Sequence, residues 1–319
     1  MMRRVFTGSV VVALTGLVAA CAAAGGPNGG ASHLPNRGIV PWTRFVPAED
    51  QPLVAVPAVP ADKWHAPAAL VVDGQVRLYV EVRSADGSRH VAVVRSDAAG
   101  ESFGVPTVCL GDEASAPSVA RAPDGTFWMA YVDPATDTLA MAQSADGTTF
   151  GTSTPTDIEA TAPSLILDDD TFVLYATIDA RIVRATAGAD RQFGAPAVVF
   201  EPGTACVDPF GKDKECWDGA AIVDADVRIA RTPAGRRVFR MMYAAHDGAG
   251  AHVGFAASFD GVRWERYAYN PVLDGTPAAF APSAVLADDR YLLYYELAEP
   301  PVVGVALAID APEATADSW

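Results

Sequence analysis

Three short runs dominate residues 217–273: WDGAAIVDADVRIA (217–230), RRVFRMMYAAHD (236–247) and AHVGFAASFDGVRWERYAYNPVL (251–273). In the second run Val238, Arg240 and Met242 alternate with the residues between them, which is the period of two that a β-strand requires. Turn signals separate the runs, and Asp260-Gly261 supplies the positive φ of a tight hairpin. The stretch predicts one antiparallel sheet of about four strands.

Weaker copies of this pattern recur along the chain. A short phrase begins at Ala66, Ala116, Ala162 and Ala281. It consists of Ala-Pro, a small residue and an apolar pair, and we call it the Ala-Pro phrase. We expect the segment Trp217–Ala220 to occupy the same place in the remaining copy. A turn, an aromatic-rich run and a third apolar run follow each phrase. A repeat of this length is typical of propeller blades.

The repeats predict an all-β, five-bladed β-propeller with blades of three to four antiparallel strands, starting near residues 66, 116, 162, 219 and 281. Sheets arranged around an axis leave only short edges. The fifth copy lacks an obvious fourth strand, so we expect the segment around 41–46 to supply it and close the ring. A two-sheet sandwich is the alternative.

Residues 1–20 have the pattern of a signal peptide: two arginines precede an apolar run that is too short for a comfortable membrane span. Its end, Leu17–Cys21, resembles the lipobox of bacterial lipoproteins. The resemblance implies that Cys21 is lipidated and that the protein is exported and anchored to the bacterial cell envelope. Residues 21–39 then form a flexible tether, and residues 40–319 the propeller. An ordinary secretory signal with a chance cysteine is the alternative.

Composition restricts the partners. The formal net charge is −16, and only 3 of the 23 basic residues are lysine, which argues against nucleic acid because phosphate binding needs clustered Lys and Arg. Such a chain is compatible with neutral ligands such as sugars. No phosphate-binding loop, dinucleotide fingerprint, HExxH or GxSxG is present in the sequence. We expect no cofactor, no metal and a monomer.

The cysteines after Cys21 suggest one crosslink. Cys206 and Cys216 bracket a polar loop, and in an exported protein a short-range disulfide is the natural interpretation. A metal site fits less well, because the nine-residue gap and the lack of a nearby His do not match zinc-ligand spacing. Cys109 is expected to be a small buried residue at the end of a strand.

The fourth copy resembles the five-bladed β-propeller glycoside hydrolases, the superfamily that contains families 43, 62, 32 and 130. The resemblance rests on FRMMYAAHDG (239–248), HVGFAASFDGVRWER (252–266) and NPVL (270–273), and the Ser-x-Asp-Gly turns are similar to the Asp-box of sialidases. It implies a carbohydrate ligand in the axial funnel and hydrolysis by paired carboxylates, roughly 6.5–9.5 Å apart in inverting enzymes. In the family-43 pattern an Asp precedes the proline, where the copies here have alanine.

Several carboxylates remain candidates for catalysis. We expect Asp218 to head an inner strand beside Trp217, although it could equally cap a turn. Of Asp224 and Asp226, one is expected to face the channel and the other an arginine, or both to form a solvated ion pair. Glu296, at the end of a second strand, is the further candidate.

Other residues are candidates for the rim of the funnel. Glu81 closes the second strand of the first copy, and Trp64 with His65 lies immediately before the first inner strand. The remaining substrate-binding candidates are Glu113, Trp217 and His246. A structural role is the alternative for each of them.

Two functions from different classes remain. The first is a surface-anchored glycoside hydrolase that acts on an oligo- or polysaccharide in the axial funnel. The second is a non-catalytic propeller that binds a glycan or a protein partner, as the alanines before proline favour.

Overall fold

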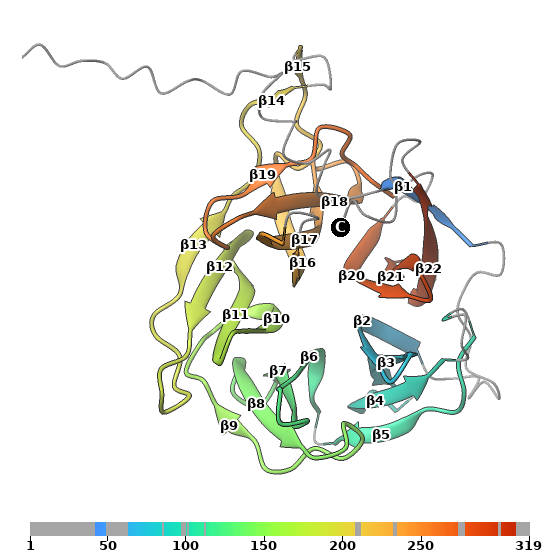
Figure 1. Cartoon of the computed structure of the whole chain (residues 1–319), viewed down its shortest axis with the longest axis vertical. Coiled ribbons are helices and arrows are strands. Elements are labelled where there is room, and N and C mark those ends of the chain that lie inside the picture. The colour runs from blue at the N-terminus through green and yellow to red at the C-terminus, as the bar shows by residue number, and fades with distance from the viewer. Residues whose placement is uncertain are drawn as a thin grey trace, which may run out of the picture.

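The computed structural model describes residues 42–48, 63–84, 86–96, 100, 102–111, 113–207, 212–231, 235–273, 278–298 and 301–310. Over these residues the chain forms five four-stranded antiparallel sheets arranged as a ring, a five-bladed β-propeller (Figure 1). The predicted fold class is therefore confirmed, and each blade has four strands. The predicted signal peptide, the predicted tether and Cys21 lie outside the described residues. Within the described part, no helix has the length and hydrophobicity that crossing a membrane needs.

The strands run outward from the axis in chain order. Blade 1 consists of β2 (Lys63–Val72), β3 (Gln75–Arg83), β4 (Arg89–Arg95) and β5 (Thr107–Leu110). Blade 2 consists of β6 (Ser115–Arg121), β7 (Phe127–Asp133), β8 (Thr138–Ser144) and β9 (Thr154–Pro155). Blade 3 consists of β10 (Thr161–Asp168), β11 (Thr171–Ile178), β12 (Arg181–Thr186) and β13 (Ala197–Phe200). Blade 4 consists of β16 (Ala221–Arg231), β17 (Arg237–His246), β18 (Ala251–Ser258) and β19 (Glu265–Arg266).

Blade 5 joins the two ends of the propeller. It consists of β20 (Ala279–Ala287), β21 (Arg290–Ala298), β22 (Pro301–Asp310) and β1 (Trp42–Pro47). The outer strand β1 pairs antiparallel with β22, and the backbone N–H of Phe45 donates to the carbonyl of Val272 at 2.6 Å. The N-terminal strand therefore closes the ring, as predicted.

A bulge interrupts the start of every inner strand. In four blades it contains the Ala-Pro phrase, and the alanine adopts a left-handed φ of 44–47°; these are Ala66, Ala116, Ala162 and Ala281. The proline disfavours the right-handed helical region for the residue before it. A left-handed conformation costs roughly 1 kcal/mol or more for a residue other than glycine, so neighbouring contacts have to hold each alanine in place.

A belt of hydrogen bonds joins consecutive inner strands. Ser118 Oγ of blade 2 accepts the N–H of Leu165 in blade 3 at 2.9 Å. The same bond recurs from blade to blade, from Val227 N to Ser164 Oγ, from Ala284 N to Asp226 Oδ2 and from Ala69 N to Ser283 Oγ. Ala68 stands in this place in blade 1, since it pairs with Tyr79 as Ser164 pairs with Tyr175. Its methyl side chain cannot accept a hydrogen bond, so the belt lacks this link.

Buried tyrosines join the blades farther from the axis. Tyr79 donates to the carbonyl of Gly147 at 2.9 Å, and Tyr175 donates to the carbonyl of Gly261 at 2.9 Å. Both glycines have a positive φ and belong to the Ser-x-Asp-Gly turns of the next blade. A Cβ on Gly147 would lie 2.9 Å from the Tyr79 hydroxyl. These turns therefore serve packing between blades.

Candidate functional site

A small cavity lies on the axis, at the end of the propeller where the inner strands begin. We call this end the N-terminal mouth. The volume of the cavity is about 50 Å³. Its lining repeats one motif around the ring: Ala66–Ala68, Ala116–Ser118, Ala162-Pro163, Asp224–Asp226 and Ala281–Ser283. The hydrogen-bonded belt places Asp226 where blades 2, 3 and 5 have serine and blade 1 has Ala68. Asp224 therefore stands in the fourth blade where the other blades have the alanine before proline.

This register corrects two expectations. The segment Trp217–Ala220 does not occupy the Ala-Pro place of the fourth copy, because β16 starts at Ala221 and its bulge lies between Ile222 and Asp224. Asp224 and Asp226 also do not lie on opposite sides of the strand. Residues two apart in a strand share a side, and both line the axial cavity.

Asp224 is a carboxylic acid with a perturbed pKa. Its pKa is raised to about 6, chiefly by burial and to a smaller extent by the negative charge of Glu296, while the hydrogen bond from Ala281 N opposes the rise. That N–H lies 3.0 Å from Asp224 Oδ2. Near neutral pH the group can therefore exist in both protonation states, which acid catalysis requires.

Glu296 reaches the same mouth from β21 of the neighbouring blade. Its Oε1 lies 2.7 Å from Nδ1 of His65, and its Oε2 accepts the N–H of Ala66 at 2.9 Å. The carboxylate thereby supports the left-handed Ala66 and fixes the imidazole ring. The Glu296 side chain remains 19% exposed, whereas Nε2 of His65 is buried without a hydrogen-bond partner. The contact between Nδ1 and the Glu296 carboxylate therefore orients the imidazole ring.

Glu81 has the corresponding role at the boundary between blades 1 and 2. Its Oε2 accepts the N–H of the left-handed Ala116 at 3.2 Å, and its Oε1 accepts from Nε of Arg83 at 2.5 Å. The glutamate is buried, but it is neutralised by this arginine. Three carboxylates, Asp224, Glu296 and Glu81, thus support alanine backbones around the mouth.

Asp226, like Glu81, has an arginine partner. It receives hydrogen bonds from Ala284 N and from Nε of Arg228, at 3.0 and 3.1 Å, and forms an ion pair with Arg228 Nη2. Burial raises its pKa, and the arginine lowers it. The predicted partnership with an arginine is therefore present, but Asp226 also belongs to the belt that connects the blades.

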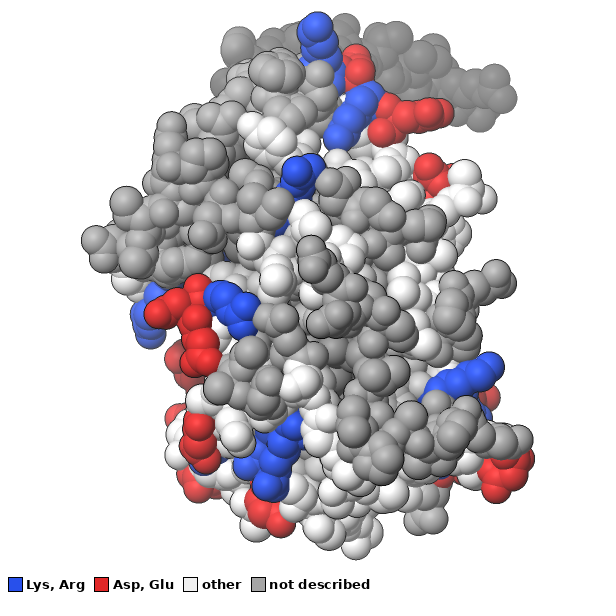
Figure 2. Space-filling view, turned by 90° about the vertical axis from the view of Figure 1, so that its right-hand side faces the viewer, with Lys and Arg blue, Asp and Glu red and all other residues white. Residues whose placement is uncertain are grey.

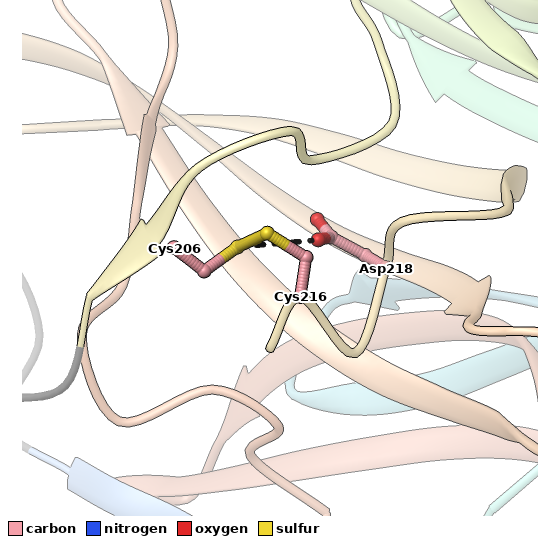
Figure 3. A group of neighbouring side chains, drawn as sticks. All are labelled: Cys206, Cys216 and Asp218. Carbon is pink, nitrogen blue, oxygen red and sulfur yellow. Dashed lines mark hydrogen bonds between the residues drawn. A yellow bond between two sulfur atoms is a disulfide. The ribbon is translucent and has the colours of Figure 1, made fainter. Parts of the chain in front are cut away.

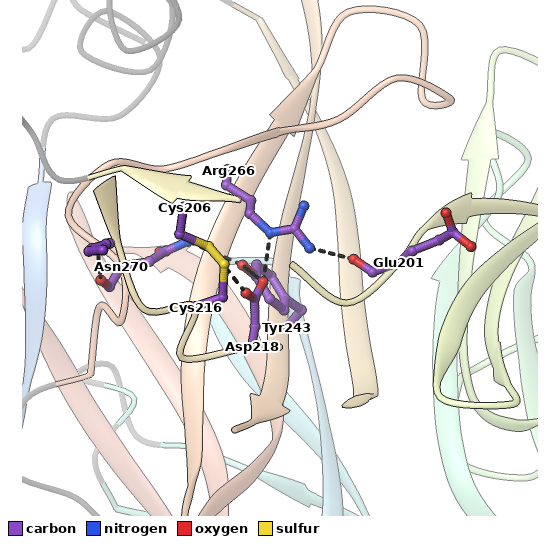
Figure 4. Close-up of a disulfide and its surroundings, with 8 residues drawn as sticks. Glu201, Cys206, Cys216, Asp218, Tyr243, Arg266 and Asn270 are labelled. Atoms are coloured by element: carbon purple, nitrogen blue, oxygen red, sulfur yellow. Dashed lines mark hydrogen bonds and ion pairs between the residues drawn. A yellow bond between two sulfur atoms is a disulfide. The ribbon is translucent and has the colours of Figure 1, made fainter. Parts of the chain in front are cut away.

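Asp218 lies away from the axial cavity, in the loop before β16. It is fully buried and accepts from Tyr243 Oη at 3.0 Å and from Nε of Arg266 at 2.6 Å (Figure 4). Arg266 also donates to the carbonyl of Glu201 in the segment that follows blade 3. The expected position of Asp218 at the head of an inner strand is therefore wrong, and its observed contacts fix the loop beside the disulfide.

The predicted disulfide between Cys206 and Cys216 is confirmed, with a Cα–Cα distance of 5.2 Å. It braces the short hairpin of β14 (Cys206–Val207) and β15 (Asp213–Lys214). Oδ1 of Asp218 lies 3.9 Å from Cys206 Sγ (Figure 3). The two sulfurs and the carboxylate are close enough to suggest a metal site, but metals bind thiolates, which a disulfide lacks. Cys109 is buried near the end of β5, as expected.

The remaining rim candidates occupy other places. Trp64 is buried in the core between blades 5 and 1, so it offers no face to a sugar at the rim. Trp217 packs on Tyr243, with ring centroids 5.4 Å apart. Glu113 is exposed and lies 3.5 Å from Nε of Arg89, while His246 ends β17. The structure therefore brings together Asp224, Asp226, Glu296 and His65 from the predicted set.

On the side that Figure 2 shows, acidic and basic side chains lie interspersed among the described residues, without a large patch of one sign. Nucleic-acid binding proteins usually present clustered positive charge.

No family model matches the chain, and no curated protein matches it. Solved structures of glycoside hydrolases of families 43, 62 and 130 share its five-bladed propeller. A glycosyl hydrolase from Bacteroides ovatus has 15% sequence identity and a TM-score of 0.58, and the match covers 86% of this chain and 94% of that one. The α-L-arabinofuranosidase PaAbf62A from Podospora anserina has 10% identity and a TM-score of 0.59, with 86% of this chain and 99% of that one covered. The GH43_1 enzyme from Xanthomonas citri has 14% identity and a TM-score of 0.56, with 79% of this chain and 89% of that one covered. At these identities the similarity establishes the fold.

Proposed function

We propose that the chain acts on carbohydrate at its N-terminal mouth and hydrolyses a glycosidic bond with Asp224 and Glu296. The observation that carries the proposal is the raised pKa of Asp224, which burial and the charge of Glu296 cause together. Glycoside hydrolysis needs one protonated and one ionised carboxyl group on either side of the bond. The shared fold with glycoside hydrolases supports a carbohydrate as the ligand.

The proposed roles follow from the surroundings of each group. Asp224 is the general acid, since its protonated form can donate to the leaving-group oxygen. Glu296 is the ionised partner in this proposal, and the N–H of Ala66 donates to one of its oxygens and holds the carboxylate in place. His65 positions this carboxylate through Nδ1. Glu296 then activates a water molecule or attacks the sugar directly, depending on the separation of the two carboxyl groups.

The test is sugar release by wild type, Asp224→Asn and Glu296→Gln. The substrates are α-L-arabinofuranosides, xylosides and β-1,2-mannosides, chosen from the activities and the ligand named for the structural relatives. Loss of a general acid typically costs about 10²–10⁴-fold in rate, so each variant is expected to lose at least about 100-fold in kcat/KM. Asp288→Asn is the matched control, because Asp288 is exposed and lies in the turn between β20 and β21, at the opposite end of the inner strands. Wild-type rates in either carboxylate variant would refute the roles.

Glycan binding without hydrolysis is the second candidate. It is favoured by alanine at the four places where the family-43 pattern has aspartate. A glycan array decides between the two: binding by wild type together with no sugar release from any bound glycan would support this candidate.

We also propose that the protein is exported and anchored through a lipid on Cys21. The basic start, the apolar run and the small residues before this cysteine support the proposal. Metabolic labelling with an alkyne fatty acid is expected to mark the wild type and not Cys21→Ser. A labelled Cys21→Ser variant, or an unlabelled wild type, would contradict it.

A further inference from the structure

A second cavity lies at the opposite, C-terminal mouth, where the inner strands end, and extends between blades 4 and 5. Its volume is about 380 Å³, within the range of roughly 300–1,000 Å³ that ligand cavities occupy. Its walls are mostly apolar and include Ile229, Met242 and Phe255 of blade 4 with Val285 and Leu286 of blade 5. Leu286 is 44% exposed, which places it where the cavity meets solvent.

Two arginines give this apolar cavity a positive character. Arg240 lies in its wall, is only 9% exposed, and donates from Nη1 to Tyr291 Oη at 3.1 Å across the boundary between the blades. Burial lowers the pKa of Arg240, because leaving water penalises its charge. An anion inside the cavity would recover part of that free energy, since charge-assisted hydrogen bonds are stronger in a dry site.

The second arginine separates this cavity from the axial site. Arg228 forms an ion pair with Asp226 and donates from Nη2 to the carbonyl of Ala69 at 2.8 Å. The side chain therefore reaches across from blade 4 to blade 1. Asp226 lines both cavities, so its ion pair with Arg228 lies between them. A ligand at the C-terminal mouth would thus lie on the other side of this ion pair from Asp224 and Glu296.

We propose that this cavity binds a small amphiphilic anion, a carboxylate attached to an apolar chain, with the carboxylate at Arg240 and the chain against Met242, Phe255 and Leu286. The apolar walls disfavour a sugar, whose hydroxyl groups would lose their hydrogen bonds to water. The arginines disfavour a cation. Charge complementarity and the apolar wall together therefore define one class of ligand.

The test is isothermal titration of the full chain with sodium octanoate, 1-octanol and octylammonium, which share one apolar body and differ in charge. Octanoate is expected to bind the wild type most tightly. Arg240→Met retains much of the side-chain bulk and removes the charge, so it is expected to weaken octanoate at least about tenfold, the value of one charged hydrogen bond, and to leave 1-octanol nearly unchanged.

A surface variant keeps the test decisive if Arg240→Met does not fold. Leu286→Glu adds a negative charge at the solvent edge of the cavity and is expected to weaken octanoate without unfolding the chain. Val108→Glu is its control, since Val108 is similarly exposed (57%) on the outer strand β5. The proposal is overturned if the wild type binds none of the probes, if octanoate and 1-octanol bind equally, or if Leu286→Glu and Val108→Glu bind octanoate alike.

Discussion

The burial of Asp224 lowers the stability of the folded protein at neutral pH but favours the protonated form that acid catalysis needs. The same burial that raises its pKa to about 6 makes the ionised form costly in the folded state. The folded state therefore binds more protons than the unfolded chain between pH 3.8 and 6. The stabilising effect of the protonated form is complete below about pH 4, and it is lost as the pH rises through 6.

We predict that Asp224→Asn raises the melting temperature at pH 7.5. The amide carries no charge and can still accept the N–H of Ala281, so the penalty of a buried carboxylate disappears. A shift of about two pKa units corresponds to at most about 3 kcal/mol, or a few degrees. Differential scanning calorimetry at pH 4 and pH 7.5 checks this. A gain that is equal at both values would contradict the ionisation argument.

We predict that hydrolysis declines above about pH 6. A general acid works only while protonated, so kcat/KM should fall tenfold per pH unit once Asp224 ionises. The measurement is a pH–rate profile with one substrate from pH 4 to 9. Glu296→Gln lowers the pKa of Asp224 by removing a negative charge, so its residual activity should decline at lower pH. An unshifted profile would argue against the coupling.

At the level of elements, some of the site could be predicted from local sequence and some could not. The strands and Asp224 were accessible through alternation and turn residues. The place of Asp224 in the repeat was missed, because the fourth copy reads Asp224-Ala225-Asp226 and lacks the Ala-Pro phrase. The contact of His65 with Glu296 joins residues 231 apart in sequence. Nothing local to either residue indicates it, since it depends on ring closure.

The belt of hydrogen bonds lacks an acceptor at Ala68, and adding one there tests how much the belt stabilises the protein. We predict that Ala68→Ser stabilises the protein by about 1 kcal/mol, because its hydroxyl can accept the N–H of Val119, the residue equivalent to Leu165 in the next blade, and one net hydrogen bond contributes about that much. Ala68 borders the axial cavity, so space for one oxygen is present. Chemical denaturation measures the change.

The reverse substitution is the matched control for Ala68→Ser. Ser118→Ala removes the existing acceptor of the Leu165 N–H and is expected to destabilise by about 1–3 kcal/mol, since a buried donor is left unsatisfied. If Ala68→Ser destabilises the chain while Ser118→Ala is neutral, the belt does not hold the blades together.

At the scale of the whole molecule, closure of the ring depends on β1, the first strand of the chain, which pairs with β22, the last. Removing residues 1–47 deletes β1, exposes the edge of β22 and uncovers the core around Phe45, which is fully buried. We predict that this truncation lowers the melting temperature by more than about 10 °C, as a loss of several kcal/mol would, or prevents folding, whereas removing residues 1–39 has little effect. Thermal unfolding of both truncations provides the measurement. Equal melting temperatures would contradict closure by β1.

The left-handed alanines have a consequence for protein engineering. Among residues other than glycine, aspartate and asparagine accept this backbone conformation more readily than most. The propeller therefore already holds Ala66, Ala116 and Ala162 in a geometry that suits an acidic side chain. New reactive groups could be installed around the axis one blade at a time, with the main chain left as it is.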